Sequence, residues 1–293
     1  MLVRDEVITE AGALNLVAID RALRSLAAGG LLISGAPAGW VLSGPTAIHG
    51  VYLRTPRTFR IPDELALGRI TDSPAAPAEI AALVARALPG GRLEVRDAER
   101  FAIAFSAPAG SGTLILHFEG PRLRMEPPPS VAGQVDRPER GYLIDDRIVY
   151  RSAASVRPIP LPVAWAEELI ARLLVTLARP AAPAGTSDEQ TIRADDLRCL
   201  LRFETTELKI AVAGPIRATF MAAVGPRVHN DSAAIATFLG GMADGIRRTA
   251  ERTLHPGALD ANLRSDDAVY GPDERSNSLA RVDTIATALR EGR

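Results

Sequence analysis

Three arginines stand close together in the segment 54–60, which reads Arg-Thr-Pro-Arg-Thr-Phe-Arg. Guanidinium groups form paired hydrogen bonds with carboxylate and phosphate oxygens, so this pattern could bind an acidic ligand or an acidic partner. Extended backbone would place Arg54 and Arg60 on one side and Arg57 on the other. A solvated edge strand is the structural alternative, because arginines at a strand edge discourage aggregation. We predict an anion- or partner-binding role for Arg54, Arg57 and Arg60.

Two histidines lie in segments where acid–base chemistry could take place. His117 follows an alternating stretch in which Leu116 and Phe118 share one face, so the imidazole is expected to face away from their core. As a general base it would need an orienting partner, which the sequence does not identify, and a surface strand histidine is the alternative. His49 lies in the turn-rich segment 44–50. We predict no catalytic residue from either position.

The remaining motifs argue against a cofactor and against a metal. The four histidines never pair at His-x-His or His-x-x-x-His spacing, which leaves only a metal assembled from distant ligands. No dinucleotide or phosphate-loop glycine pattern is present, and Lys209 is the only lysine. Neither a Gly-x-Ser-x-Gly nor a Ser-x-x-Lys motif is found. Adjacent acidic residues point in different directions and are interpreted as structural or solvated: Asp145-Asp146, Glu167-Glu168, Asp195-Asp196 and Asp266-Asp267.

Apolar periodicity predicts the elements that would position such residues. Helical spacing predicts helices over 9–28, 77–88, 162–179 and 232–254, with a short one over 279–289. Alternation and turn residues predict strands over 31–34, 40–42 and 51–54, then an antiparallel meander over 92–125. A hairpin is expected over 142–150, and three more strands over 197–203, 208–212 and 216–224.

These elements predict an α+β fold with two antiparallel β-meander units, each packed against helices. Ile103-Ala104, Thr113 and Gly120-Pro121-Arg122 recur as Ile210-Ala211, Thr219 and Gly225-Pro226-Arg227, which suggests a weak internal duplication or a chance likeness of Gly-Pro turns. The expected organisation is an N-terminal α+β domain at 1–179, a linker at 180–190, a meander with a long helix at 191–254, and a polar tail at 255–293.

Composition narrows the function classes. Hydrophobic residues make up 47% of the 293 and charged residues 24%, as in ordinary globular proteins. The net charge of −1 provides no field for nucleic acid or an anionic membrane, so neither partner is expected. Cys199 stands alone and excludes an intramolecular disulfide, which fits a reducing compartment. The start of the sequence lacks a signal-peptide pattern, and we expect a soluble cytoplasmic protein.

Two functions remain open. The first is a non-enzymatic binding or adaptor protein of an intracellular bacterial-type assembly, with a protein partner or self-association through strand edges, the proline-rich loop 126–140 and the polar tail. The second is a small-molecule-binding protein or enzyme with an apolar pocket between the sheet and the 232–254 helix, where Gly240-Gly241 would leave room. The absence of a catalytic motif favours the first.

Overall fold

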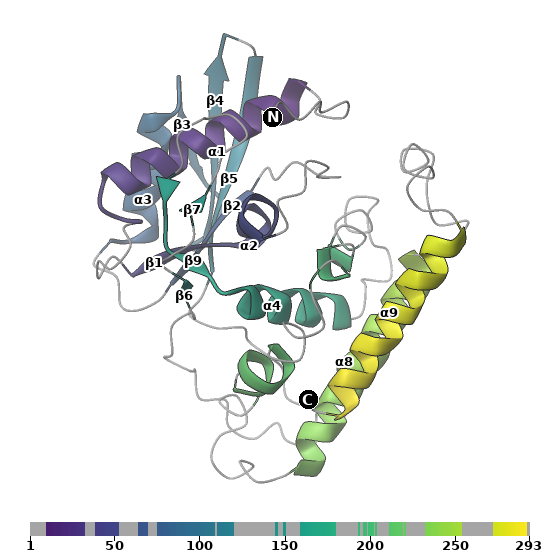
Figure 1. The fold of residues 1–293 in the computed structure, drawn as a ribbon. Helices are drawn as coiled ribbons and strands as arrows, with labels where there is room; N and C mark the ends of the chain where they lie inside the picture. Colours follow the sequence, from purple (N-terminus) through teal and green to yellow (C-terminus); the bar gives the residue numbers. More distant parts are fainter. Residues whose placement is uncertain are drawn as a thin grey trace. The chain divides into compact units, whose positions relative to one another are not determined.

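The chain forms two compact units in a mixed α+β fold, which confirms the α+β class and not the finer plan predicted within it. Unit 1 comprises Met1–Arg122 with Glu139–Leu169, and unit 2 comprises Leu123–Pro138 with Ile170–Arg293. Figure 1 shows the elements of both. The computed structural model describes residues 10–32, 39–52, 64–69, 75–108, 110–119, 144–145, 149–150, 159–179, 193, 196–197, 199–201, 203, 211–218, 220, 232–253 and 272–291.

A mixed sheet forms the centre of unit 1. Its strand order in the described residues is β3-β4-β5-β2-β1-β9-β6. Neighbours pair antiparallel except for β2 with β5 and β1 with β9, which are parallel. The strands are β1 (Trp40–Ser43), β2 (Glu64–Arg69), β3 (Arg92–Val95), β4 (Arg100–Ala107), β5 (Gly110–Glu119), β6 (Ile144–Asp145) and β9 (Val163–Ala164), and a separate ladder joins β7 (Val149–Tyr150) to β8 (Ile159–Pro160).

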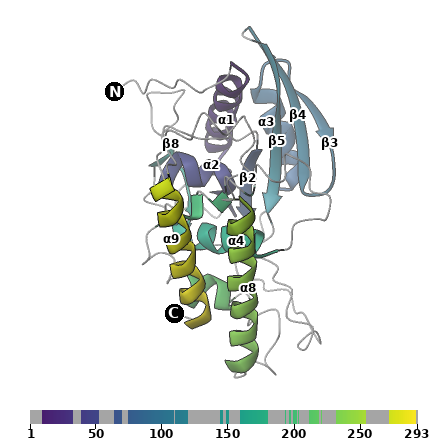
Figure 2. The same ribbon diagram turned by 90° about the vertical axis from the view of Figure 1, so that its right-hand side faces the viewer.

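Two helices cover one face of this sheet (Figures 1 and 2). α1 (Glu10–Ala28) contacts β5 and α3 (Pro77–Ala87), and α3 also contacts β3 and β4. Leu114, Leu116 and Phe118 alternate along β5 and are buried beneath them. The intervening residues of β5 point to the opposite face, because successive strand side chains alternate. That opposite face carries His117 and Glu119 of β5.

A short helical segment leaves β1 at its carboxyl end. α2 (Gly44–Ala47) follows Ser43 directly, continues into η1 (Ile48–Tyr52), and contacts both β1 and β2. The Tyr52 hydroxyl donates a hydrogen bond to the Ala164 carbonyl oxygen at 2.6 Å, which ties η1 to β9.

Unit 2 is built from helices in its described part. α4 (Ala166–Ala178) contributes its residues from Ile170 onward, followed by η3 (Val212–Ile216), α8 (Ser232–Thr253) and α9 (Pro272–Glu291). α8 and α9 pack side by side in both views. A Cβ on Gly245 would lie 2.3 Å from the Ala178 carbonyl oxygen, so α8 and the end of α4 approach closely there.

Several predicted strands are wrong. Leu197, Leu200 and Val212 are helical where strands were expected, because short apolar runs satisfy strand and helix patterns alike. Val51 and Tyr52 belong to η1 and not to a strand. The expected hairpin at 142–150 is absent, since β6 pairs with β9 and β7 with β8. The sheet of unit 1 contains parallel pairs, and Val212–Ile216 is helical where the second meander was expected. The prediction of two antiparallel meander units and the internal duplication are therefore not confirmed.

The predicted helices agree with the structure more closely than the predicted strands do. α1, α3 and α8 match the expected ranges closely, and α9 is longer than the short helix expected near its end. In the described part of the chain, no helix combines the length and apolar character needed to cross a membrane.

Candidate functional site

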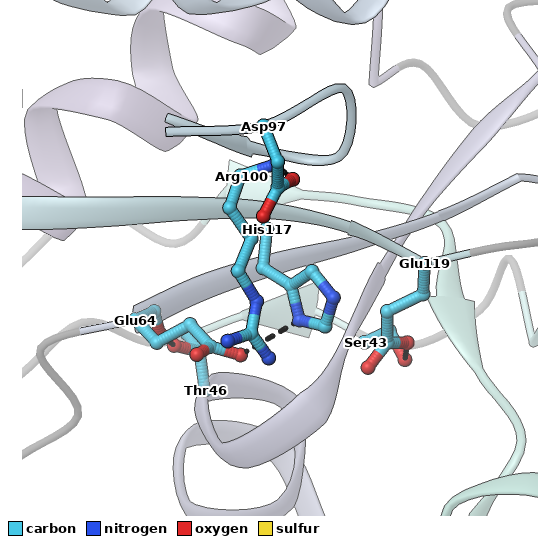
Figure 3. Close-up of polar contacts among 7 residues, drawn as sticks. All are labelled: Ser43, Thr46, Glu64, Asp97, Arg100, His117 and Glu119. Atoms are coloured by element: carbon cyan, nitrogen blue, oxygen red, sulfur yellow. Dashed lines mark hydrogen bonds and ion pairs between the residues drawn. The ribbon is translucent and has the colours of Figure 1, made fainter. Parts of the chain in front are cut away.

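Four residues form a row across four strands on the polar face of unit 1. Ser43 of β1 pairs with Ala66 of β2, Ala66 with His117 of β5, and His117 with Arg100 of β4. Residues paired across a ladder project to the same face. The polar row Ser43–Ala66–His117–Arg100 therefore collects a hydroxyl, an imidazole and a guanidinium around one small residue, as Figure 3 shows for the three polar members.

His117 is held by a carboxylate from the neighbouring strand. Its Nδ1 lies 3.0 Å from Glu64 Oε1, and the two side chains are 20% and 29% exposed. Glu64 lies two residues before Ala66, so it is a diagonal neighbour of His117. Because Nδ1 is engaged with Glu64, Nε2 is the ring nitrogen left for a second hydrogen bond.

The surroundings of His117 favour the protonated ring. The hydrogen bond to Glu64 raises the pKa of His117 above its ordinary value of 6.5. Burial opposes this rise, the negative charges of Glu64 and Glu119 reinforce it, and the Arg100 guanidinium opposes it. The net result is an imidazole that keeps its proton to a higher pH than a free histidine does.

A second polar pair lies beside the first. The Ser43 hydroxyl donates a hydrogen bond of 2.6 Å to Glu119 Oε2, and Ser43 is fully buried. Glu119 belongs to β5 and Ser43 to β1, so their side chains meet across β2. Ser43 pairs with Ala66 and Glu119 with Gly68, and the small size of these two β2 residues lets the contact form over β2.

Backbone geometry fixes where these groups sit. Gly44 has a φ of +62°, and a Cβ there would lie 2.6 Å from the Ala66 Cβ, so only glycine fits the turn between β1 and α2. The Thr46 hydroxyl donates to the Glu64 carbonyl oxygen at 3.2 Å, which ties α2 to the start of β2. Asp97 Oδ1 accepts the Arg100 N–H at 2.7 Å and anchors the start of β4.

The polar cluster contains groups that can donate and accept protons. Its members are Ser43, Glu64, Arg100, His117 and Glu119. An imidazole oriented by a carboxylate can deliver a proton, and a nearby carboxylate can accept one. His117 and Glu119 are two residues apart on one strand face, which separates their Cα atoms by about 7 Å. No set of three or more His, Cys, Asp or Glu residues in the described ranges is placed to hold a metal ion.

The residues singled out from the sequence had different outcomes. His117 faces away from the apolar core as predicted, and Glu64 is the orienting partner that the sequence did not identify. His49 lies in η1, and its side chain is outside the described part. Arg54, Arg57 and Arg60 fall outside the described residues, so their binding role stays a prediction.

Sequence reasoning missed Ser43, Glu64, Arg100 and Glu119. Glu64 was missed because β2 was not predicted, although Leu65 and Leu67 alternate directly after it. Ser43 had a usable signal, since it ends an apolar strand immediately before Gly44-Pro45.

Comparison with known proteins leaves the family open. No family model matches the chain, and no curated protein is similar to it. Helicobacter pylori JHP933 resembles it with a TM-score of 0.44 and 12% identity, covering 97% of this chain and 94% of that one. An H. pylori protein provisionally described as a nucleotidyltransferase has the same TM-score of 0.44 with 16% identity, covering 95% of each chain. Because both TM-scores are below 0.5, we infer neither fold nor activity from them.

Proposed function

We propose that the chain is an enzyme whose active site is the polar cluster of unit 1, and that it transfers a group to or from an oxygen of a small polar substrate. His117 would act as the general acid through Nε2, with Glu64 as its positioning residue. Glu119 would act as the general base toward a substrate hydroxyl, as it already accepts a hydroxyl hydrogen from Ser43.

The observation that carries this proposal is the shielded pairing of His117 with Glu64 beside a second carboxylate. Glu64 and Glu119 flank the imidazole on the same sheet face, and the pKa of His117 is raised mainly by its hydrogen bond to Glu64. A histidine whose pKa is perturbed by a specific charged partner is a candidate functional residue.

The test is conversion of a defined substrate panel by the wild type and by His117→Gln. The panel contains nucleotides, sugar phosphates, amino acids and hydroxy acids, and products are followed by mass spectrometry. Loss of a general acid lowers the rate about 10²–10⁴-fold. Thr113→Val is the matched control, because Thr113 is exposed on the same strand face outside the cluster. Equal rates for wild type and His117→Gln would contradict the assignment.

The functions expected from the sequence stay hypotheses beside this one. One of them is an apolar pocket between the sheet, which belongs to unit 1, and α8, which belongs to unit 2. This pocket is a different site from the polar cluster and stays a separate proposal. The adaptor role, a protein partner, the cytoplasmic location and the domain limits drawn from the sequence are likewise kept as proposals. The polar cluster is preferred because its residues are brought together by the fold itself.

A further inference from the structure

Arg100 is the member of the polar row whose charge has no partner among the described residues. Its side chain is exposed, and among the described residues its guanidinium has no hydrogen bond or ion pair. The backbone is nevertheless fixed, because Asp97 accepts the N–H groups of both Glu99 and Arg100, at 2.8 and 2.7 Å. Figure 3 shows the guanidinium alongside the imidazole of His117.

Two basic groups therefore face each other across a strand pair. Arg100 and His117 are direct partners in the β4–β5 ladder, where Cβ atoms are about 4.5–5.5 Å apart. Like charges at such positions destabilise a sheet. Glu64 contacts His117 and Glu119 accepts a hydrogen bond from Ser43, and among the described residues neither carboxylate pairs with the Arg100 guanidinium, which can therefore meet a ligand.

Small residues follow Arg100 along this face of β4, of which Ala102 is buried and Ala104 half-buried. Ala102 and Ala104 follow Arg100 on the same face of β4, and neither carries a side chain beyond Cβ. The two groups that can donate to a ligand here are the planar guanidinium fork of Arg100 and, when the ring is protonated, Nε2 of His117. A tetrahedral oxyanion has enough oxygens to accept from both, whereas a planar carboxylate is satisfied by the fork alone.

We propose that the substrate of this site carries a phosphate group, which Arg100 and His117 bind together. This inference rests on the proposed function, since it identifies the substrate class of the same cluster. Arg100 sets the specificity by holding the phosphate, and His117 contacts the same group at the atom that would receive a proton.

The test is NMR titration of the His117 imidazole with inorganic phosphate at pH 7. Saturable shifts with a Kd in the millimolar range are expected for so small a probe, about 4 kcal/mol of binding free energy. Arg100→Ala should weaken binding at least tenfold and Arg100→Lys by less, because lysine keeps the charge but loses the fork. Arg92→Ala is the matched control, as Arg92 is exposed on the same face of edge strand β3.

Three results would overturn the inference: no saturable shift, equal affinity in wild type and Arg100→Ala, or acetate binding as tightly as phosphate. Thermal melts of each variant verify that the fold is retained. Phosphate binding without any His117-dependent conversion would remove the proposed function alone. His117-dependent conversion of a substrate without phosphate would remove this inference alone.

Discussion

Charged side chains of the unit 1 sheet meet across strands, whereas those of the unit 2 helices pair along an exposed surface. In unit 1 the His117–Glu64 pair is 20% and 29% exposed, and Ser43 is fully buried under its contact with Glu119. In unit 2, Arg247–Asp283 and Arg290–Asp244 join α8 to α9 at 2.8 and 2.5 Å, with aspartates 63% and 54% exposed. Shielding lets a partner shift a pKa, while solvent weakens an exposed pair.

The two units also use glycine differently. Gly44 supports the polar cluster by allowing α2 to start against β2, and Gly245 lets α8 approach α4. Gly240 and Gly241 lie in the same helix as Gly245, but a Cβ on either would meet nothing within 4 Å. The fold therefore requires glycine where a Cβ would collide with a neighbouring residue, and the number of glycines in a helix does not show where that is.

Gly44→Ala should give the largest loss of stability. The substitution combines a left-handed backbone, which costs about 1–2 kcal/mol for residues other than glycine, with an overpacked contact that costs about 1–3 kcal/mol. Urea denaturation should show the midpoint falling accordingly. If Gly44→Ala unfolds at the wild-type urea concentration, the tight turn between β1 and α2 is wrong.

Gly245→Ala and Gly240→Ala should shift stability in opposite directions. A Cβ at position 245 collides with backbone, which costs about 1–3 kcal/mol, whereas alanine in an open helix interior is favoured over glycine by about 0.5–1 kcal/mol. Thermal melts of the two single variants provide the comparison. Shifts of the same sign would refute the close packing of α8 on the end of α4.

Asp244→Ala should have a small effect. Its partner Arg290 and its own carboxylate are both substantially exposed, and pairs of this kind contribute about 0.2–1 kcal/mol. The loss should shrink further in 1 M salt, which screens exposed charges. A salt-independent loss of several kcal/mol would mean that the helix pair depends on this contact in a way the exposure does not support.

The sequence predicted the helices and one face of the sheet well, because both follow from local periodicity. β3, β4 and β5 were recognisable from alternation, and His117 was assigned to the correct face. The parallel pairing of β2 with β5 was not, since it joins residues about 50 apart and leaves no local mark. The Glu64 and Ser43 contacts depend on that pairing, so the candidate site could not be assembled from the sequence.

The pH dependence of stability follows from the raised pKa of His117. A group whose pKa is higher in the folded than in the unfolded state contributes stability that is fully present below its unfolded pKa and is lost as pH rises through its folded pKa. Wild type should therefore lose stability relative to His117→Gln as the pH is raised from 6 through the folded pKa. Glu64→Gln should remove most of this dependence.

The central claim is that Glu64 holds His117 as a charged, oriented acid, and NMR titration of the His117 ring in wild type and Glu64→Gln tests it most directly. The account predicts a wild-type pKa above 6.5 that falls in Glu64→Gln, where the remaining influences are burial, Glu119 and Arg100. A wild-type pKa at or below 6.5, or one unchanged by Glu64→Gln, would contradict it.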